Sequence, residues 1–140
     1  MPPFVAEIPV RFADVDHAGI VYYPRFFHYF HVAFEEMWRA RVGAHAYRDL
    51  LDRERVGFPA VRAECDFKAP LRFGDTAEVA LSIDRLGGKS ISFRYRVHRV
   101  DPRQLAAEGT VTCAVVDLAR FVAVAVPEHV SRILADLVQP

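Results

Sequence analysis

Residues 24–43 read PRFFHYFHVAFEEMWRARVG, a stretch dominated by aromatic and other apolar side chains. The apolar side chains recur at steps of three and four, which is the spacing of one face of an α-helix. The positions on this face are Phe26, Phe27, Phe30, Ala33, Phe34, Met37 and Trp38. The spacing predicts one long helix. Because its aromatic face is too large for exposure to water, we expect a sheet to cover it.

The two ends of this helix carry their own signals. Pro24 suits the first turn, where its missing N–H costs nothing, and a glycine such as Gly43 is common just past the last turn. A residue that precedes proline is restricted to extended conformations, so Tyr23 is expected as the N-cap. A second, shorter helix is expected over Ala44 to Arg53.

Beyond the second helix the apolar period falls from about 3.6 to 2, the period of a β-strand. The alternation from Val61 to Ala69 predicts a strand with one solvated face. The alternating runs 79–83 and 91–97 predict two more strands, joined by a turn at Gly87–Gly88. Residues 109–117 are apolar or small on both faces, which predicts a central strand.

Three further elements complete the expected fold. Phe4 to Phe12 is predicted as a strand that lies partly at a sheet edge because it contains Pro9. Phe121 to Val126 is predicted as the last strand, and Pro127 as the start of a closing helix. The apolar stripe of that helix is Val130, Ile133, Leu134 and Leu137. This order predicts a single α+β domain over residues 1–140, with an antiparallel sheet curved around the long helix.

The overall composition excludes several classes of protein. Lysine plus arginine and aspartate plus glutamate both number 18, so the net charge gives no sign of a nucleic-acid partner. The longest apolar run, 121–127, is too short to cross a membrane. Cys65 and Cys113 lie far apart with no secretory segment after Met1, so we expect two reduced thiols in a cytoplasmic protein.

The segment before the long helix, ADVDHAG at residues 13–19, holds two acids close together. It begins like a calcium loop, but the twelfth position, where a bidentate glutamate is required, is Arg25. The DxD pattern also occurs in phosphotransferases, which need βαβ units that this chain lacks. A helical metal cluster of His28, His31 and Glu35 is not supported by any HExxH motif. We therefore expect neither a metal nor a cofactor.

Acyl transfer fits this segment better. Asp16 stands seven residues before the expected N-cap, where free backbone N–H groups and the positive end of the helix dipole favour an anion. A carbonyl oxygen that gains charge during acyl transfer is such an anion. A turn at Gly19 would fold the carboxylate back toward that carbonyl. The same residues are equally compatible with Asp14 and Asp16 making only turn and capping bonds.

The segment RFADVDHAGIVYYPRFFHYFHVAFEEMWR, residues 11–39, resembles the signature of the hot-dog-fold 4-hydroxybenzoyl-CoA thioesterase family. It is also similar to the related thioesterases encoded in Tol-Pal gene clusters. The similarity continues through FPAVRAECDFKAPLRFGD, residues 58–75, and GGKSISFRYRV, residues 87–97. It implies a hot-dog fold and hydrolysis of an acyl-CoA thioester, and it leaves aromatic, short and medium acyl groups open.

The resemblance also assigns roles at the loop. It implies that Asp16 is the catalytic carboxylate, that the backbone N–H of Tyr23 polarises the thioester carbonyl, and that Gly19 is the turn glycine. Asp16 could attack the carbonyl carbon or activate water as a general base. His17 is a possible assisting residue at the substrate, although a solvent-exposed loop histidine is the simpler interpretation. Asp14 is expected to order the loop, and Glu36 on the helix is a weaker catalytic candidate.

The phosphates of CoA require cations. The related enzymes that act on aromatic acyl groups have a basic cluster before the strand that begins here at Lys89. This chain keeps Arg85, Lys89 and Ser90 but has Gly87 and Gly88 where that cluster has arginine. We expect Lys89 and Ser90 to contact phosphate, followed by Arg62, for which a solvated strand end is an equally simple role.

The same resemblance implies a homo-oligomer, at least a dimer and by analogy a tetramer, with sites at the subunit boundary. Three alternatives remain at this point. A thioesterase for acyl-carrier protein would share the fold and the carboxylate. A hot-dog dehydratase would place a histidine and an acid differently on the helix. A non-catalytic acyl-CoA-binding module would have no use for a carboxylate at the carbonyl.

Overall fold

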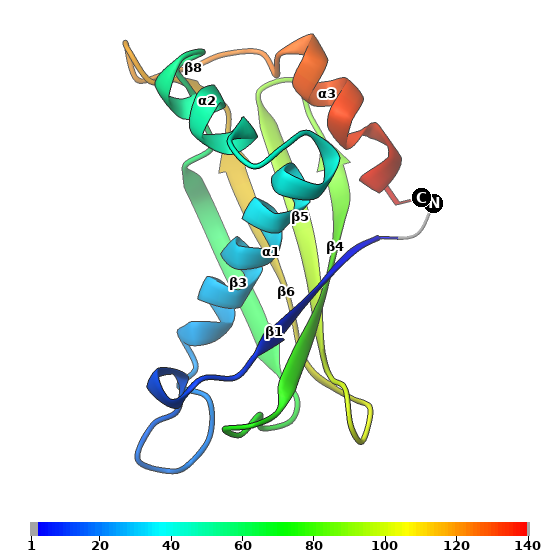
Figure 1. Ribbon diagram of the computed structural model, residues 1–140. Helices are drawn as coiled ribbons and strands as arrows, with labels where there is room; N and C mark the ends of the chain where they lie inside the picture. The colour runs from blue at the N-terminus through cyan, green and yellow to red at the C-terminus, as the bar shows by residue number, and fades with distance from the viewer. Residues whose placement is uncertain (1–2, 140) are drawn as a thin grey trace.

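The computed structural model describes residues 3–139, and its centre is a helix held in a curved sheet (Figure 1). Helix α1, Arg25–Arg41, lies against the sheet, which has five strands in the order β1-β4-β5-β6-β3. Every neighbouring pair is antiparallel. The strands are β1 Phe4–Pro9, β3 Ala60–Phe67, β4 Thr76–Leu86, β5 Ser90–Arg99 and β6 Gln104–Ala114. The predicted α+β class and the sheet wrapped around one long helix are confirmed.

Smaller elements close one end of the molecule. A second sheet, in the order β2-β7-β8, lies near helix α2 (Figure 1). Each strand of this small sheet has two residues. The closing helix, α3, is followed directly by a 3-10 turn. The bounds are α2 Ala46–Asp52, β2 Val56–Gly57, β7 Val116–Asp117, β8 Val122–Ala123, α3 Glu128–Leu134 and the 3-10 turn Ala135–Leu137. The predicted short second helix and the closing helix after Pro127 are confirmed, each with slightly narrower bounds.

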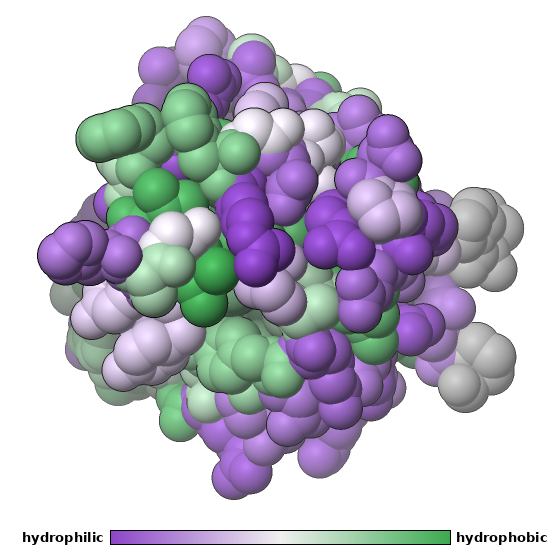
Figure 2. Space-filling view, turned by 90° about the horizontal axis from the view of Figure 1, so that it is seen from below, coloured by the Kyte–Doolittle hydropathy of each residue, from purple (hydrophilic) through white to green (hydrophobic). Residues whose placement is uncertain are grey.

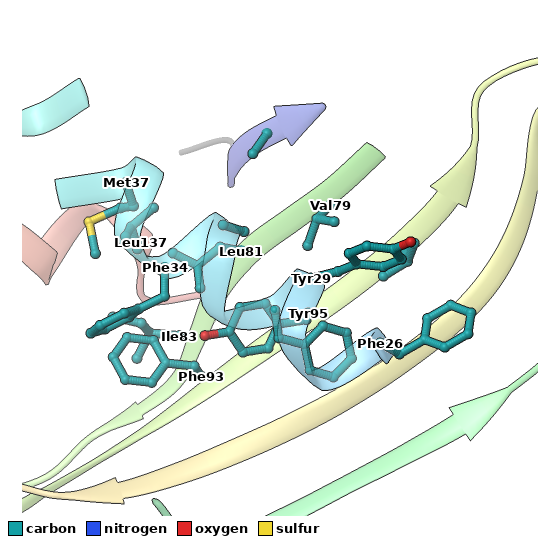
Figure 3. Close-up of a cluster of buried hydrophobic side chains, with 14 of the residues drawn as sticks. Phe26, Tyr29, Phe34, Met37, Val79, Leu81, Ile83, Phe93, Tyr95 and Leu137 are labelled. Carbon is teal, nitrogen blue, oxygen red and sulfur yellow. The ribbon is translucent and has the colours of Figure 1, made fainter. Parts of the chain in front are cut away.

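The aromatic face of α1 forms the core with the inner residues of β4 and β5 (Figure 3). Phe30 stacks on Tyr95 with ring centroids 4.5 Å apart and an angle of 6°. The residues at alternate positions of β4 and β5 are fully buried, as their period predicts: Val79, Leu81, Ile83, Ile91, Phe93, Tyr95 and Val97. Burial of so many aromatic and branched side chains is the main stabilising contribution to this fold.

The register of the strands defines two ends of the sheet. At one end Pro9 pairs with Thr76, and Val10 donates to the carbonyl of Asp75, so the acidic loop that follows β1 begins there. We call this the loop end. At the other end Leu86 pairs with Ile91 across the glycine turn. We call this the turn end. At about 3.3 Å per residue, the length of β4 separates the two ends by roughly 30 Å.

Strand β3 differs from the expectation of one solvated face, because both of its faces are largely exposed. Val61 is 66% exposed and Phe67 48% exposed, although their alternation placed both on the apolar face. The reason is position: β3 is an edge strand beside β6, and α1 packs mainly against β4 and β1. One long apolar edge is therefore left without cover in a single chain.

Other strand boundaries also differ from the prediction. The first strand ends at Pro9, and a 3-10 turn, Phe12–Asp14, follows it. The predicted strand 109–117 is divided between β6 and β7, although β6 does lie inside the sheet, between β5 and β3, as its composition predicted. Of the predicted strand 121–126 only Val122–Ala123 is extended and paired. Apolar composition marked these segments as buried but did not show where the chain leaves the large sheet.

Gly109 on β6 is required by close packing between strands and helix. A side-chain carbon at this position would clash with the carbonyl oxygen of Glu64 and would lie 3.1 Å from the ring of Phe30. We expect Gly109→Ala to lower the free energy of unfolding by about 1–3 kcal/mol, measured by urea denaturation. Gly43→Ala is the matched control, because nothing lies within 4 Å of its new carbon, and it should cause no loss of stability. Equal stability of the two variants would contradict the packing role of Gly109.

Candidate active site

The acidic loop between β1 and α1 is a small, hydrogen-bonded hairpin. Val15 and Val21 form an antiparallel bridge, Asp16 donates its N–H to the carbonyl of Ile20 at 2.9 Å, and Tyr22 donates to the carbonyl of Asp14 at 2.9 Å. The N–H of Val21 bonds to Leu71 outside the loop at 2.8 Å. The loop is thus ordered by its own backbone and fixed to the body of the protein.

Asp14 anchors the loop to α1. Its side chain is buried, with the residue 7% exposed, and one carboxylate oxygen accepts the Arg11 N–H and the Tyr29 hydroxyl, each at 2.9 Å. The Arg25 guanidinium lies 3.8 Å from the other oxygen. A carboxylate bonded in this way is a structural group, so the expectation that Asp14 orders the loop agrees with the geometry.

Tyr29 is the residue that the sequence reasoning missed. It lies three positions after Phe26, on the same helix face, and that spacing could have identified it as buried and in need of a partner for its hydroxyl. Burial, and then the hydrogen bond to Asp14, raise the pKa of Tyr29 well above its usual value. The hydroxyl therefore stays protonated and donates to Asp14 at neutral pH.

Asp16 is placed differently from Asp14. It is partly exposed, and its Oδ1 accepts the N–H of Ala18 at 2.8 Å. Its carbonyl accepts the N–H of Gly19 at 2.9 Å, and Gly19 has φ of +83°, a conformation that favours glycine. The expected glycine turn is therefore present. The Oδ2 of Asp16 accepts no hydrogen bond from any residue that the structure describes, so it is available to a substrate or a water.

The start of α1 differs in detail from the prediction. Pro24, and not Tyr23, is the N-cap. The chain already turns at Tyr22, because Arg25, Phe26 and Phe27 each donate to the carbonyl three residues back, at 2.8, 3.2 and 3.1 Å. The sequence had suggested that these amides are free to bind an anion. In the structure they are occupied by the bonds of the turn.

One donor remains at this end of the helix. The N–H of Tyr23 bonds to nothing among residues 3–139, and Pro24 has no N–H. The first turn of a helix also carries the positive end of its dipole. A single backbone donor in this field thus lies on the same short loop as the open oxygen of Asp16.

The surface beside Tyr23 is apolar. The ring of Tyr23 contacts Phe67 with centroids 6.1 Å apart, and Phe67 in turn contacts Phe26. A groove of about 400 Å³ runs here, lined also by Val21 and Leu71. Figure 2 looks onto this end of the molecule and shows hydrophobic side chains that interrupt the hydrophilic surface. Low polarity strengthens the interaction of a donor with developing charge.

The residues predicted to bind the substrate are not brought together in one chain. Lys89 and Ser90 lie at the turn end, where the Val115 N–H bonds to the Lys89 carbonyl, roughly 30 Å from the acidic loop along the strands. Arg62 is exposed and pairs with Glu64 at 3.1 Å. His17 is exposed in the loop. Within a single chain, therefore, only Asp16, Gly19, Tyr23 and His17 share one site.

Other candidate groups have ordinary structural roles. His31 pairs with Glu35 at 3.1 Å, and Glu36 pairs with Arg39 at 3.6 Å on the exposed side of α1. In the part of the chain that the structure describes, no group of three or more His, Cys, Asp or Glu is arranged to hold a metal. Both cysteines are free. No helix within residues 3–139 has the length and apolar character needed to cross a membrane.

Comparison with known proteins connects this geometry to a family. The model of the Thioesterase-like superfamily matches residues 10–134, which include the acidic loop, α1 and every strand of the large sheet except β1. The chain belongs to the Thioesterase-like superfamily. The resemblance drawn from the loop and helix motif is thus confirmed.

Individual proteins similar to this chain agree with this assignment. The chain is 33% identical over 97 residues to the 1,4-dihydroxy-2-naphthoyl-CoA hydrolase of Synechococcus sp. (strain CC9311), a match that covers 66% of this chain and 64% of that protein. It therefore spans less than two thirds of that relative. It is 27% identical over 127 residues to the acyl-CoA thioesterase YbgC of Haemophilus influenzae, covering 91% of this chain and 90% of that protein.

Solved structures similar to this chain confirm the hot-dog fold. The 1,4-dihydroxy-2-naphthoyl-CoA thioesterase Slr0204 from Synechocystis superposes with a TM-score of 0.87 at 26% identity, and the match covers 98% of each chain. The agreement extends over the central helix, the curved sheet and the small elements at the turn end.

The Asp14–Tyr29 bond should carry measurable stability. Tyr29→Phe removes one donor from a buried carboxylate, so we expect the free energy of unfolding to fall by about 1–3 kcal/mol. Urea denaturation followed by circular dichroism measures the change. Tyr22→Phe is the control, because Tyr22 is exposed, and it should leave stability unaltered. A Tyr29→Phe protein as stable as the wild type would show that Asp14 does not depend on this bond.

Proposed function

We propose that this protein is a hydrolase that cleaves the thioester of an acyl-CoA to a free acid and CoA. The observation that carries the proposal is the pairing, on one ordered loop, of an open carboxylate oxygen on Asp16 with the unbonded N–H of Tyr23. A thioester carbonyl bound at that N–H would present its carbon to the carboxylate. The names of the related hydrolases and thioesterases support the same activity.

The chemistry needs little more than these two groups. The Tyr23 N–H and the helix dipole stabilise negative charge on the carbonyl oxygen. Asp16 either attacks the carbonyl carbon, giving a mixed anhydride that water opens, or removes a proton from an attacking water. A thiolate is a good leaving group, so no strong general acid is required. Gly19 maintains the turn that holds the carboxylate, and His17 stands next to it.

Asp16→Asn provides the direct test. The amide can neither attack nor accept a proton, so we expect release of CoA to fall by at least about a hundredfold, while the unfolding transition stays unchanged. Thiol release is measured with benzoyl, short-chain and long-chain CoA esters. Asp52→Asn, an exposed acid on α2, is the control and should retain full activity.

The outcomes of this assay also separate the alternatives. Wild-type rates in purified Asp16→Asn would remove the assignment of Asp16. Binding of esters with no release from any of them would favour a non-catalytic acyl-CoA-binding module. Faster release from acyl-carrier protein than from CoA would favour a carrier-protein thioesterase.

We further propose that the protein assembles through β3, as a dimer or as a tetramer built from dimers. The exposed apolar side chains of this edge strand favour pairing with a second copy. In a two-fold antiparallel pair, the Phe67 end of one β3 lies beside the Ala60 end of its partner. The turn end of the partner, with Arg62, Lys89 and Ser90, would then approach the acidic loop of the first chain. This arrangement would supply the cations for CoA that one chain lacks at its loop end.

Disruption of the β3 edge tests the assembly. Val61→Lys places a charge on the exposed edge, so we expect sedimentation to shift from a dimer or larger species toward the 15.9 kDa chain. Hydrolysis should fall with it, because the CoA site would be incomplete. Val5→Lys is the matched control on β1, the opposite edge strand, and should change neither. A fully active monomer would contradict a shared site.

The predicted location of the protein stays a prediction. A cytoplasmic location agrees with the two free thiols, Cys65 and Cys113. Burial raises the pKa of the Cys113 thiol to about 11, so this group is protonated at neutral pH and has no part in the proposed reaction.

A further inference from the structure

Two turns with the same sequence pattern, Arg-Phe-x-Asp, lie side by side at the loop end, the lower end in Figure 1. They are RFAD at residues 11–14 and RFGD at residues 72–75. In each turn the N–H of the aspartate bonds to the carbonyl of the arginine, at 2.9 and 3.0 Å. The aspartate side chain accepts the arginine N–H in return, at 2.9 and 2.8 Å. The N–H of Val10 joins the second turn through the Asp75 carbonyl at 2.9 Å. We call the two segments the twin turns.

The twin turns present an exposed pair of aromatic rings. Phe12 is 79% exposed and Phe73 is 62% exposed, and the two rings meet edge to face with centroids 6.0 Å apart. Neither residue belongs to the core of the protein, and the proposed reaction uses neither. Hydrogen-bonded turns hold both side chains in the solvent. A cluster of exposed aromatic side chains of this kind marks an interaction surface.

Each ring is preceded by an exposed arginine that has no acidic partner. The guanidinium groups of Arg11 and Arg72 form no ion pair with any acid among residues 3–139. The acids of the same turns, Asp14 and Asp75, already accept backbone N–H groups. The twin turns therefore combine two exposed rings with two unpaired positive charges.

The shape and the charge of this tip favour an anionic lipid bilayer as its partner. Neither ring lines the larger hollows of the described surface, so the tip gives a helix or an extended peptide no groove to lie in. A two-fold contact with a second copy would bring Arg11 and Arg72 against the same charges of the other chain. A bilayer needs no groove, because its headgroups pair with cations and aromatic rings bind at the boundary with the acyl chains.

We propose that the twin turns dock the protein onto an anionic membrane surface. The rings of Phe12 and Phe73 would enter the boundary between headgroups and acyl chains. The guanidinium groups of Arg11 and Arg72 would bind the lipid phosphates. Such docking is peripheral and reversible, because two rings bury far less apolar surface than a helix that spans the bilayer.

Docking would also bring the proposed active site to the lipid surface. Leu71, which lines the groove at Tyr23, directly precedes Arg72 in the chain, so the groove and the tip share one end of the molecule. In the proposed β3 pair the two loop ends point in opposite directions, so one tip of a dimer docks at a time. The delivery of an acyl ester from the bilayer to this groove rests on the proposed function, whereas the docking itself does not.

Co-sedimentation of the full chain with lipid vesicles tests the proposal. Vesicles of phosphatidylcholine alone are compared with vesicles that contain about 30 mol% phosphatidylglycerol. We expect the protein to bind the anionic vesicles at least about tenfold more tightly than the neutral ones, and to lose this preference as the salt concentration rises. Absence of binding to the anionic vesicles would overturn the proposal.

Two double variants separate the rings from the charges. Phe12→Ser with Phe73→Ser should weaken binding to anionic vesicles by about tenfold or more, because the apolar contact is lost. Arg11→Gln with Arg72→Gln should remove the preference for anionic vesicles, because the cations are lost while the backbone bonds of the turns remain. All four side chains are exposed, so both variants should keep the unfolding transition of the wild type. Wild-type binding by the ring variant would contradict the docking role.

The chain supplies a matched control at its other end. Arg120 and Phe121 form another exposed Arg-Phe pair, next to β8, and Arg120→Gln with Phe121→Ser should bind vesicles as the wild type does. If the ring variant instead alters the sedimentation of the protein alone, the tip is a contact between copies. If the wild type binds polyglutamate but not vesicles, the tip recognises an acidic protein. Either result overturns the proposal. Vesicle binding is measured without substrate and is repeated with Asp16→Asn, so the result does not depend on hydrolysis of any ester.

Discussion

The width of one helix determines how much of the sheet is covered in this molecule. An α-helix is about 10 Å across, whereas five strands at a spacing of about 4.8 Å span about 20 Å. Helix α1 covers β4 and its neighbours and leaves the β3 side of the sheet bare. That single mismatch gives the protein an unpaired apolar edge, a hollow between α1 and strands β3, β5 and β6, and the basis for the proposed assembly.

The two acids of the loop have separate roles that their close spacing in the sequence hides. Asp14 is buried and bonded to Arg11 and Tyr29, and it holds the loop against the helix. Asp16 is partly exposed, and one of its oxygens is open. A carboxylate proposed for catalysis must stay in place while at least one of its oxygens remains open. The buried acid provides the anchoring, so the open acid does not have to.

The sequence predicts the regular elements well and the local hydrogen bonding poorly. The period of the apolar residues identifies α1 and the inner faces of β4 and β5, because burial there follows directly from spacing. It cannot show that β3 is an edge strand, since edge position depends on which strands pair. The restriction on the residue before proline places the N-cap one residue early, at Tyr23, because the turn at Tyr22 depends on bonds between backbone groups. The Asp14–Tyr29 bond, 15 residues apart, joins two segments whose meeting only the folded chain shows.

The proposed hydrolytic groups of one subunit all fall within residues 14–23, a contiguous segment closed by its own backbone bonds. The walls of the hollow along α1 come instead from α1 itself, from Tyr47 of α2, from Phe58 and from strands β3, β5 and β6. Under the proposed function, mutation could therefore alter the wall residues, and with them the preferred acyl group, while the proposed reacting centre is inherited intact. A fold organised in this way is suited to evolutionary diversification, in which one cleavage chemistry is kept and the molecule that it acts on is exchanged.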